Sequence, residues 1–163
     1  MGHQPSYTAE MEIRLANAED ARLIAAHRRA MFAAMEAADD AVLTTMESAS
    51  IPWTEYMILE GRYLGWIASD GERPVASAGM FLLDWPPHPF DPEGTVRGYL
   101  LNVFVDPAYR KRGLARELVR MCLAEAKRHG IRVVTLHASD AGKPLYEELG
   151  FAMTNEMRLD LTK

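Results

Sequence analysis

The segment from Leu100 to His129 constrains the fold more than any other part of the chain. It opens with Leu-Leu-Asn-Val-Phe-Val, an apolar, β-branched and aromatic run that Asp106-Pro107 ends. Such a run is typical of a buried strand that stops at a turn. From Leu114 onwards the larger apolar residues recur every three or four positions, as on the buried face of a helix, and Gly130 follows its basic last turn. The sequence therefore predicts a strand and a helix joined by a short loop.

The loop between them, Arg110-Lys111-Arg112-Gly113, carries three cations and a glycine. The first N–H groups of a helix have no acceptor within the helix, and the helix dipole gives this end a partial positive charge. We therefore expect the loop to bind an anionic group such as a phosphate. The other basic residues of the segment fit a solvated helix face better than a ligand site: Arg116, Arg120, Lys127 and Arg128.

The composition indicates one globular domain over residues 1–163, with residues 1–9 as a loose tail. Hydrophobic residues make up 48% of the chain and charged residues 25%, and the net charge of −5 argues against nucleic acid as a partner. The single cysteine, Cys122, allows no internal disulfide and fits a buried structural thiol in a reducing compartment. No apolar run is long enough to cross a bilayer, and the N-terminus lacks the build of a signal peptide. We expect a cytoplasmic protein without a membrane partner.

The remaining patterns predict the other elements of a sheet and its helices. Met11 to Leu15 alternates apolar and charged residues, as a half-buried strand does, and Asn17 is a good N-cap for the helix that follows. Ser69-Asp70-Gly71-Glu72 indicates a hairpin. The further expected elements are a polar connection over 39–50, a helix from Pro52 to about Tyr63, strands over 64–68 and 74–83, an irregular proline-rich loop over 85–92, a strand over 131–137, a helix over 139–149 and a last strand over 153–161.

Two sequence motifs resemble those of a known family. Arg110-x-x-Gly113-x-Ala115, preceded by Val103-x-Val105-x-Pro107, closely resembles the acetyl-coenzyme A signature of the GNAT acetyltransferase superfamily. Leu145-Tyr146-x-x-x-Gly150-Phe151 is similar to the segment that ends the GNAT core. The resemblance covers roughly residues 64–161. It implies an α/β fold, with a strongly twisted, mixed and mostly antiparallel sheet and helices on both faces.

The same resemblance implies where the coenzyme binds. The loop amides and the following helix would hold its pyrophosphate, which involves Arg110, Lys111, Arg112, Gly113, Leu114 and Ala115. The preceding strand would splay from its neighbour, so that the backbone of Val103, Phe104 and Val105 pairs with the pantetheine arm. Ser139 stands where the family often has an asparagine that touches the coenzyme.

The implied reaction moves an acetyl group from acetyl-coenzyme A, as cosubstrate, directly to a primary amine of a small molecule or peptide. Such transfer needs a neutral amine, a stabilised oxyanion, and a proton for the departing thiolate. By the resemblance, Tyr146 is the general acid, although a packing role with a solvated hydroxyl is the alternative. The oxyanion donor would be a main-chain amide near Val105. The base stays open among His137, Asp84, Glu55 and a water, because the cofactor strand offers Asn102 and Tyr99 where many relatives have a glutamate.

Other interpretations fit the same residues. The chain could be a coenzyme A binding regulator or sensor without catalysis, or a GNAT enzyme that uses another acyl donor such as succinyl-coenzyme A. The scattered histidines and one cysteine form no zinc pattern, so no metal site is expected. Residues 36–63 and 84–98 would set the acceptor; there Trp53, Tyr56 and Met57 either pack against the sheet or wall the acceptor pocket. The oligomeric state stays open, and a homodimer is one alternative, because dimers are common among the proteins that the chain resembles.

Overall fold

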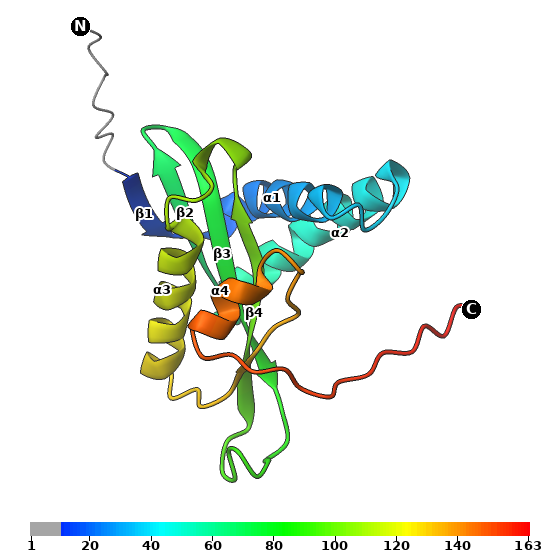
Figure 1. Ribbon diagram of the computed structural model, residues 1–163, viewed down its shortest axis with the longest axis vertical. Helices are drawn as coiled ribbons and strands as arrows, with labels where there is room; N and C mark the ends of the chain where they lie inside the picture. Colours follow the sequence, from blue (N-terminus) through cyan, green and yellow to red (C-terminus); the bar gives the residue numbers. More distant parts are fainter. Residues whose placement is uncertain (1–10) are drawn as a thin grey trace, which may run out of the picture.

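The computed structural model describes residues 11–163, and its centre is one five-stranded sheet (Figure 1). The strands lie in chain order: β1 (Met11–Leu15), β2 (Tyr63–Asp70), β3 (Arg73–Asp84), β4 (Val96–Val105) and β5 (Val134–Thr135). β1 to β4 pair antiparallel, and β5 runs parallel to β4. The predicted mixed, mostly antiparallel sheet is therefore confirmed. The loose tail predicted over 1–9 lies outside the described residues.

Helices cover both faces of the sheet, as predicted (Figure 1). α1 (Ala21–Ala34) and α2 (Asp40–Leu59) lie together on one face, and α3 (Leu114–Arg128) and α4 (Lys143–Glu148) lie on the other. Two short 3-10 helices, η1 (Ala18–Asp20) and η2 (Pro107–Tyr109), precede α1 and α3. Asn17 caps η1 as expected, because its side chain accepts a hydrogen bond from the Glu19 amide (2.9 Å).

The core sits between α3 and the sheet. Leu118, Val119 and Cys122 of α3 are fully buried and pack in one cluster with Met80 of β3 and Leu100 of β4. Burying a leucine or valine side chain contributes about 1.5–3 kcal/mol, so the apolar face of α3 fixes this helix against the strands. Cys122 is fully buried, as predicted for a structural thiol, and burial raises the pKa of this thiol to about 12.

β4 is irregular in a way that shapes the site. Asn102 has a positive φ of 56°, and the register with β3 shifts between Ser77 and Gly79, so β4 bulges at this point. On its other side β4 pairs with β5 only through Gly98 and Tyr99. From Leu100 to Val105, therefore, one edge of β4 has no strand partner among the described residues, which agrees with the splayed strand that the resemblance implies.

The predicted polar connection over 39–50 is wrong, because α2 already begins at Asp40. Asp39 caps this helix by accepting a hydrogen bond from the Val42 amide (2.9 Å), and the alanine, leucine, methionine and glutamate residues that follow favour a helix. Pro52, expected in the first turn, lies inside the helix. A proline there removes one backbone hydrogen bond, but α2 lies along α1, and such packing supplies most of the stability of a protein helix.

The elements predicted nearest the C-terminus are shorter than expected or absent. β5 forms only over 134–135 of the expected 131–137, and α4 only over 143–148 of 139–149. The last strand predicted over 153–161 is wrong, because residues 151–160 adopt no regular structure and Met157 is 94% exposed. The alternating pattern is present, but a strand also needs a neighbour with free ladder groups, and no described strand pairs with this segment.

Candidate active site

The loop between β4 and α3 presents unpaired backbone amides. Gly113, the N-cap of α3, has a φ of 82°, and Lys111 has a φ of 61°. Within residues 11–163, the amides of Lys111, Arg112, Gly113 and Leu114 donate to no acceptor. Left-handed residues in such a turn gather successive N–H groups into a concave anion site, and the start of α3 adds its dipole. The geometry fits the phosphate site that the sequence predicts.

The cations of this loop are placed by backbone oxygens rather than by carboxylates. Arg110 Nε donates to the Val105 carbonyl (3.2 Å), and Arg112 Nη2 donates to the Ala108 carbonyl (3.1 Å). The exposed loop brings no described Asp or Glu within ion-pair distance of Arg110, Lys111 or Arg112. Their charges therefore stay available to a bound anion. Arg116 and Arg128, in contrast, pair with Glu148 and Glu125.

The predicted pantetheine strand follows directly on the bulge. Val103 and Val105 pack partly against the core, and the Phe104 ring lies 4.4 Å from the ring of His27 on α1. Burial lowers the pKa of His27 to about 4, and its Nδ1 hydrogen-bonds Ser77 Oγ (2.8 Å), so His27 is a buried structural histidine. The side chains of Val103 to Val105 are thus fixed by packing, while their backbone lies on the unpaired edge of β4.

Tyr146 lies on α4, and Ser139 lies in the segment that leads into this helix. Tyr146 is half-buried, its ring meets the Phe151 ring edge-on with centroids 5.8 Å apart, and burial raises the pKa of its phenol. The phenol therefore holds its proton at neutral pH and is able to donate a hydrogen bond. Ser139 Oγ accepts a hydrogen bond from the Gly142 amide (3.1 Å), which ties it to the turn that leads into α4.

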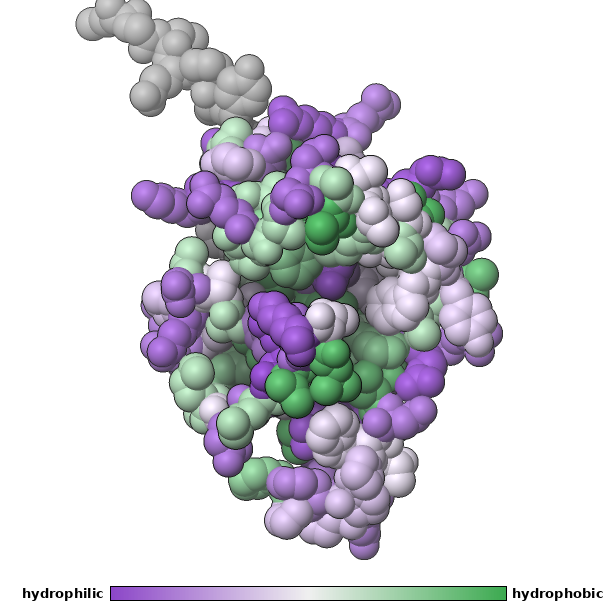
Figure 2. All heavy atoms as spheres, turned by 90° about the vertical axis from the view of Figure 1, so that its right-hand side faces the viewer, coloured by the Kyte–Doolittle hydropathy of each residue, from purple (hydrophilic) through white to green (hydrophobic). Residues whose placement is uncertain are grey.

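A cavity of about 540 Å³ opens between α1, α2, β3 and β4. Figure 2 shows the face that lies to the right in Figure 1, hollowed near its centre, with hydrophobic side chains in and beside the hollow. The walls of the cavity are largely apolar and include Met46, Trp53, Phe81, Leu83 and Leu101. Trp53 therefore lines a pocket, one of the two roles considered for it, and its ring meets the Phe81 ring edge-on with centroids 5.1 Å apart.

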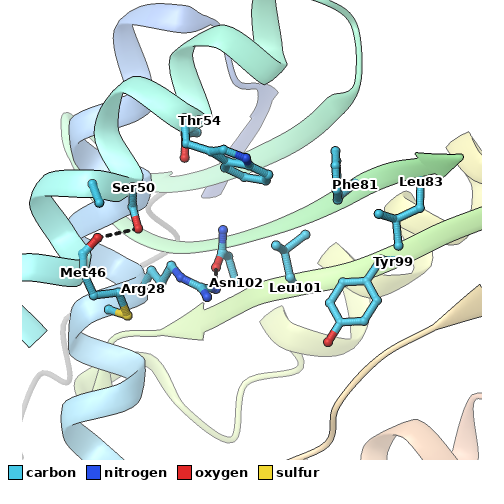
Figure 3. A pocket seen from close by; sticks show the side chains of 11 residues that line it. Arg28, Met46, Ser50, Thr54, Phe81, Leu83, Tyr99, Leu101 and Asn102 are labelled. Atoms are coloured by element: carbon cyan, nitrogen blue, oxygen red, sulfur yellow. Dashed lines mark hydrogen bonds between the residues drawn. The ribbon is translucent and has the colours of Figure 1, made fainter. Parts of the chain in front are cut away.

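The two ends of the cavity carry different polar groups (Figure 3). Arg28 and Asn102 point toward each other at one end, and Tyr99 lies at the other, with Leu101 between them. Asn102 Oδ1 accepts from Arg28 (2.8 Å), and Asn102 Nδ2 donates to the buried Tyr63 hydroxyl (3.0 Å). The sequence gives no signal for Arg28 in this place, since its contact with Asn102 spans 74 positions.

Of the base candidates, the structure connects His137 to the cavity, through Tyr99 in the cavity wall. The Tyr99 hydroxyl hydrogen-bonds His137 Nδ1, and His137 Nε2 lies 3.0 Å from Glu156 Oε1. Asp84 does not line the cavity and pairs with Arg62 (3.2 Å), and Glu55 points to solvent on α2. A chain of groups able to pass a proton thus leads from the cavity at Tyr99 through His137 to the exposed Glu156.

Among residues 11–163, no group of three or more His, Cys, Asp and Glu side chains could hold a metal ion. No helix of this part of the chain has the length and apolar character to cross a membrane.

Solved structures share this fold and a part of its sequence. A GCN5-related N-acetyltransferase from Ralstonia eutropha is 36% identical, with a TM-score of 0.88 over 94% of this chain and 99% of that one. An acetyltransferase structure with acetyl-CoA from Clostridium acetobutylicum has a TM-score of 0.86 at 24% identity, over 93% and 97% of the two chains, and so shows the fold alone.

The curated relatives are covered over a smaller share of their length than these solved structures are. The chain is 38% identical over 90 residues to glucosamine 6-phosphate N-acetyltransferase of Trypanosoma brucei brucei, which covers 55% of this chain and 58% of that protein. The chain thus spans between half and two thirds of the length of the curated relatives it matches. The family model itself matches residues 24–151, from within α1 to just beyond α4. Because this match takes in most of the chain, including the β4 edge and the amide-rich loop, the chain belongs to the acetyltransferase (GNAT) family.

Proposed function

We propose that this protein transfers an acetyl group from acetyl-coenzyme A to the primary amine of a small molecule bound in the cavity. One observation supports this most directly: the cavity and the coenzyme edge share strand β4. Leu101 and Asn102 line the cavity, and the unpaired edge at Val103 to Val105 follows at once and leads to the amide-rich loop. An amine in the cavity and a thioester along β4 would meet in a ternary complex, without an acetylated enzyme intermediate.

The coenzyme would be held by backbone groups and cations. The loop amides from Lys111 to Leu114, the Ala115 amide in the first turn of α3, and the side chains of Arg110 and Arg112 suit its pyrophosphate. The unpaired backbone of Val103 to Val105 suits the amides of the pantetheine arm, which would take the place of a neighbouring strand. The coenzyme supplies the thioester, whose acyl carbon is the electrophile.

In the transfer, an N–C bond forms and the C–S bond breaks. The amine loses one proton, and the departing thiolate gains one. Tyr146 is our candidate for the second proton, because a half-buried phenol with a raised pKa is protonated at neutral pH and can donate its hydrogen bond to the departing thiolate. The proton passes to the sulfur, and the phenol regains a proton from solvent. A main-chain amide near Val105 would stabilise the oxyanion.

For the first proton, we favour the pair of Tyr99 and His137. The Tyr99 hydroxyl is the titratable group at the apolar end of the cavity, and burial raises its pKa, so it does not act as a lone base. It would accept the proton of the amine while passing its own proton to His137 Nδ1. Glu156, beside His137 Nε2, would stabilise the resulting imidazolium.

The cavity also bears on the acceptor. A volume of about 540 Å³ with apolar walls is typical of a site for a small ligand rather than for a long peptide. The relative from Trypanosoma brucei brucei is named for a phosphorylated amino sugar, which is a small primary amine. A peptide whose terminal residue alone enters the cavity is the second candidate.

Of the alternatives for the oligomeric state, the homodimer belongs to the proposal. Met153, Met157, Leu159 and Leu161 alternate with polar residues, are all at least 75% exposed, and end a segment that extends away from the body (Figure 1). Such a segment is suited to add a strand to a second copy of the chain. Light scattering of the full chain tests this; a monomer at all concentrations would refute it. The cytoplasmic location stays a prediction.

The function is tested by measuring binding and turnover separately. Acetyl-coenzyme A should raise the melting temperature clearly more than an adenine nucleotide that lacks the pantetheine arm. Thiol release in the presence of a panel of amines should then identify an acceptor. Tight coenzyme binding without thiol release for any amine would instead indicate a non-catalytic coenzyme A sensor, and faster release from succinyl-coenzyme A would indicate another donor.

A further inference from the structure

Arg28 is a cation in the cavity that no carboxylate of residues 11–163 neutralises. It comes from α1, is half-buried, and its Nη1 donates to the neutral amide oxygen of Asn102 (2.8 Å). Its guanidinium carbon lies 4.9 Å from the centre of the Phe32 ring. Burial lowers the pKa of this guanidinium, yet arginine remains charged at any pH at which the protein is folded.

Its neighbours on the chain and in space are neutralised. Arg29 pairs with Asp40 and with Glu47 (3.4 Å), and Arg62 pairs with Asp84 (3.2 Å). No Asp or Glu among residues 11–163 lies within ion-pair distance of Arg28. The other polar side chains that line the cavity are all uncharged at neutral pH: Ser50, Trp53 and Thr54 of α2, and Tyr99 and Asn102 of β4.

A half-buried guanidinium without an anion is unfavourable, because it gives up part of its hydration and gains no ion pair. Arginine has five N–H donors in a planar fork that fits a carboxylate or phosphate in a bidentate way. Asn102 accepts from one nitrogen of the fork and thereby holds its plane in the cavity. The guanidinium of Arg28 gains an ion pair only when a bound ligand supplies the negative charge.

We propose that Arg28 binds an anionic group of the acceptor, so that the substrate is an amine that also carries a carboxylate or phosphate. This inference rests on the proposed function. The acceptor has its anion at the Arg28 and Asn102 end, an apolar part against Leu101, Phe81 and Leu83, and its amine within reach of Tyr99 at the far end (Figure 3). The coenzyme does not supply this anion, because its phosphates belong at the loop before α3.

The test compares amines in matched pairs. 4-(Aminomethyl)benzoate and 4-(aminomethyl)benzamide differ in charge at nearly constant shape, and 3-aminopropyl phosphate and 3-amino-1-propanol form the phosphate pair. The value of kcat/KM should be higher for the anionic member of at least one pair, by about 10- to 100-fold, the usual contribution of a charged hydrogen bond. A preference in the benzoate pair indicates a carboxylate acceptor, and a preference in the phosphate pair indicates a phosphate acceptor. Equal or better turnover of the neutral members in both pairs would overturn the proposal.

Variants then assign the preference to Arg28. Arg28→Met keeps an apolar stem of similar length and should abolish the preference, because it lowers kcat/KM for the anionic member of a pair more than for the neutral member. Arg28→Lys keeps the charge and should retain part of the preference. Arg29→Met is the matched control, since Arg29 pairs with Asp40 and Glu47 and does not line the cavity; it should keep the full preference. A preference that survives in Arg28→Met would overturn the assignment.

A binding measurement tests the anion site independently of whether the protein acetylates the amine. If no amine is acetylated, the proposed function fails, but the anion site is still measured by calorimetry of 4-(aminomethyl)benzoate and 3-aminopropyl phosphate with the coenzyme-loaded protein. Binding of either one that Arg28→Met weakens supports the anion site. Binding of neither, or binding unaffected by Arg28→Met, refutes it. If Arg28→Met does not fold, the proposal is tested by Arg28→Lys and by the preference of the wild type. A wild-type preference for the anionic amine that Arg28→Lys reduces supports the anion site, and the absence of a wild-type preference refutes it.

Discussion

Gly113→Ala tests, through the backbone alone, the proposal that the loop before α3 binds the coenzyme. Gly113 has a φ of 82°, and a Cβ at this position would meet no atom within 4 Å, so the substitution causes no clash. Its cost is the left-handed conformation, about 1–2 kcal/mol for a residue with a Cβ. For a chain of this size that corresponds to a fall of about 2–8 °C in the melting temperature.

Gly130→Ala is the matched control at the other end of α3. Gly130 has a φ of 71° and equally open surroundings, so the same stability loss is expected there. Only Gly113→Ala should also weaken coenzyme binding, because a loop that relaxes from the left-handed region turns the amides of Gly113 and Leu114 away from the phosphates. Losing one charge-assisted hydrogen bond corresponds to about 10- to 100-fold in Kd.

The assay is calorimetry with coenzyme A on both variants, together with their thermal unfolding. Similar destabilisation with weaker binding in Gly113→Ala alone would support the loop. Gly113→Glu should abolish binding altogether, because it adds an anion beside the pyrophosphate. If Gly113→Ala binds coenzyme A as tightly as Gly130→Ala does, the pyrophosphate does not lie on these amides.

Three further predictions concern side chains. Tyr146→Phe should lower kcat about 100-fold while coenzyme affinity stays within a few fold; an unaltered kcat measured by thiol release would remove Tyr146 from the mechanism. Tyr99→Phe and His137→Gln should each lower kcat by about tenfold or more and alter the acidic limb of the pH–rate profile alike, and profiles identical to wild type would rule out the proton path. Burial lowers the pKa of His27 from 6.5 to about 4, so between these pH values His27 is protonated in the unfolded chain but not in the folded protein. The free energy of unfolding should therefore fall by up to about 3 kcal/mol as the pH is lowered from 6.5 to 4. Urea titrations of wild type and His27→Gln check this, and an equal pH dependence in both would contradict it.

The strand, loop and helix from Leu100 to His129 could be predicted because their signals are local. Asp106-Pro107 ends a strand, Gly113 permits a left-handed N-cap, and the spacing of Leu114, Leu118 and Cys122 places one helix face in the core. None of these depends on a residue far away in the chain.

The parts that failed depend on partners distant in sequence. The segment over 153–161 has the alternation of a strand, but pairing requires an adjacent edge that the sequence does not reveal. Pro52 suggests a helix start, and only the packing of α2 along α1 keeps the helix running through it. The cavity is hidden for the same reason, since Arg28, Trp53, Phe81 and Asn102 come from α1, α2, β3 and β4.

The bulge at Asn102 joins backbone shape to the choice of acceptor. Asparagine is among the few residues that readily adopt a positive φ, and its amide contacts both Arg28 and Tyr63. A glycine would keep the backbone and lose both contacts, whereas Asn102→Asp would keep the contact with Arg28 and supply the carboxylate that this arginine lacks. One substitution of nearly equal size would thus convert a pocket selective for anionic amines into one that accepts neutral amines, which gives a protein of this kind a short evolutionary route to new substrates.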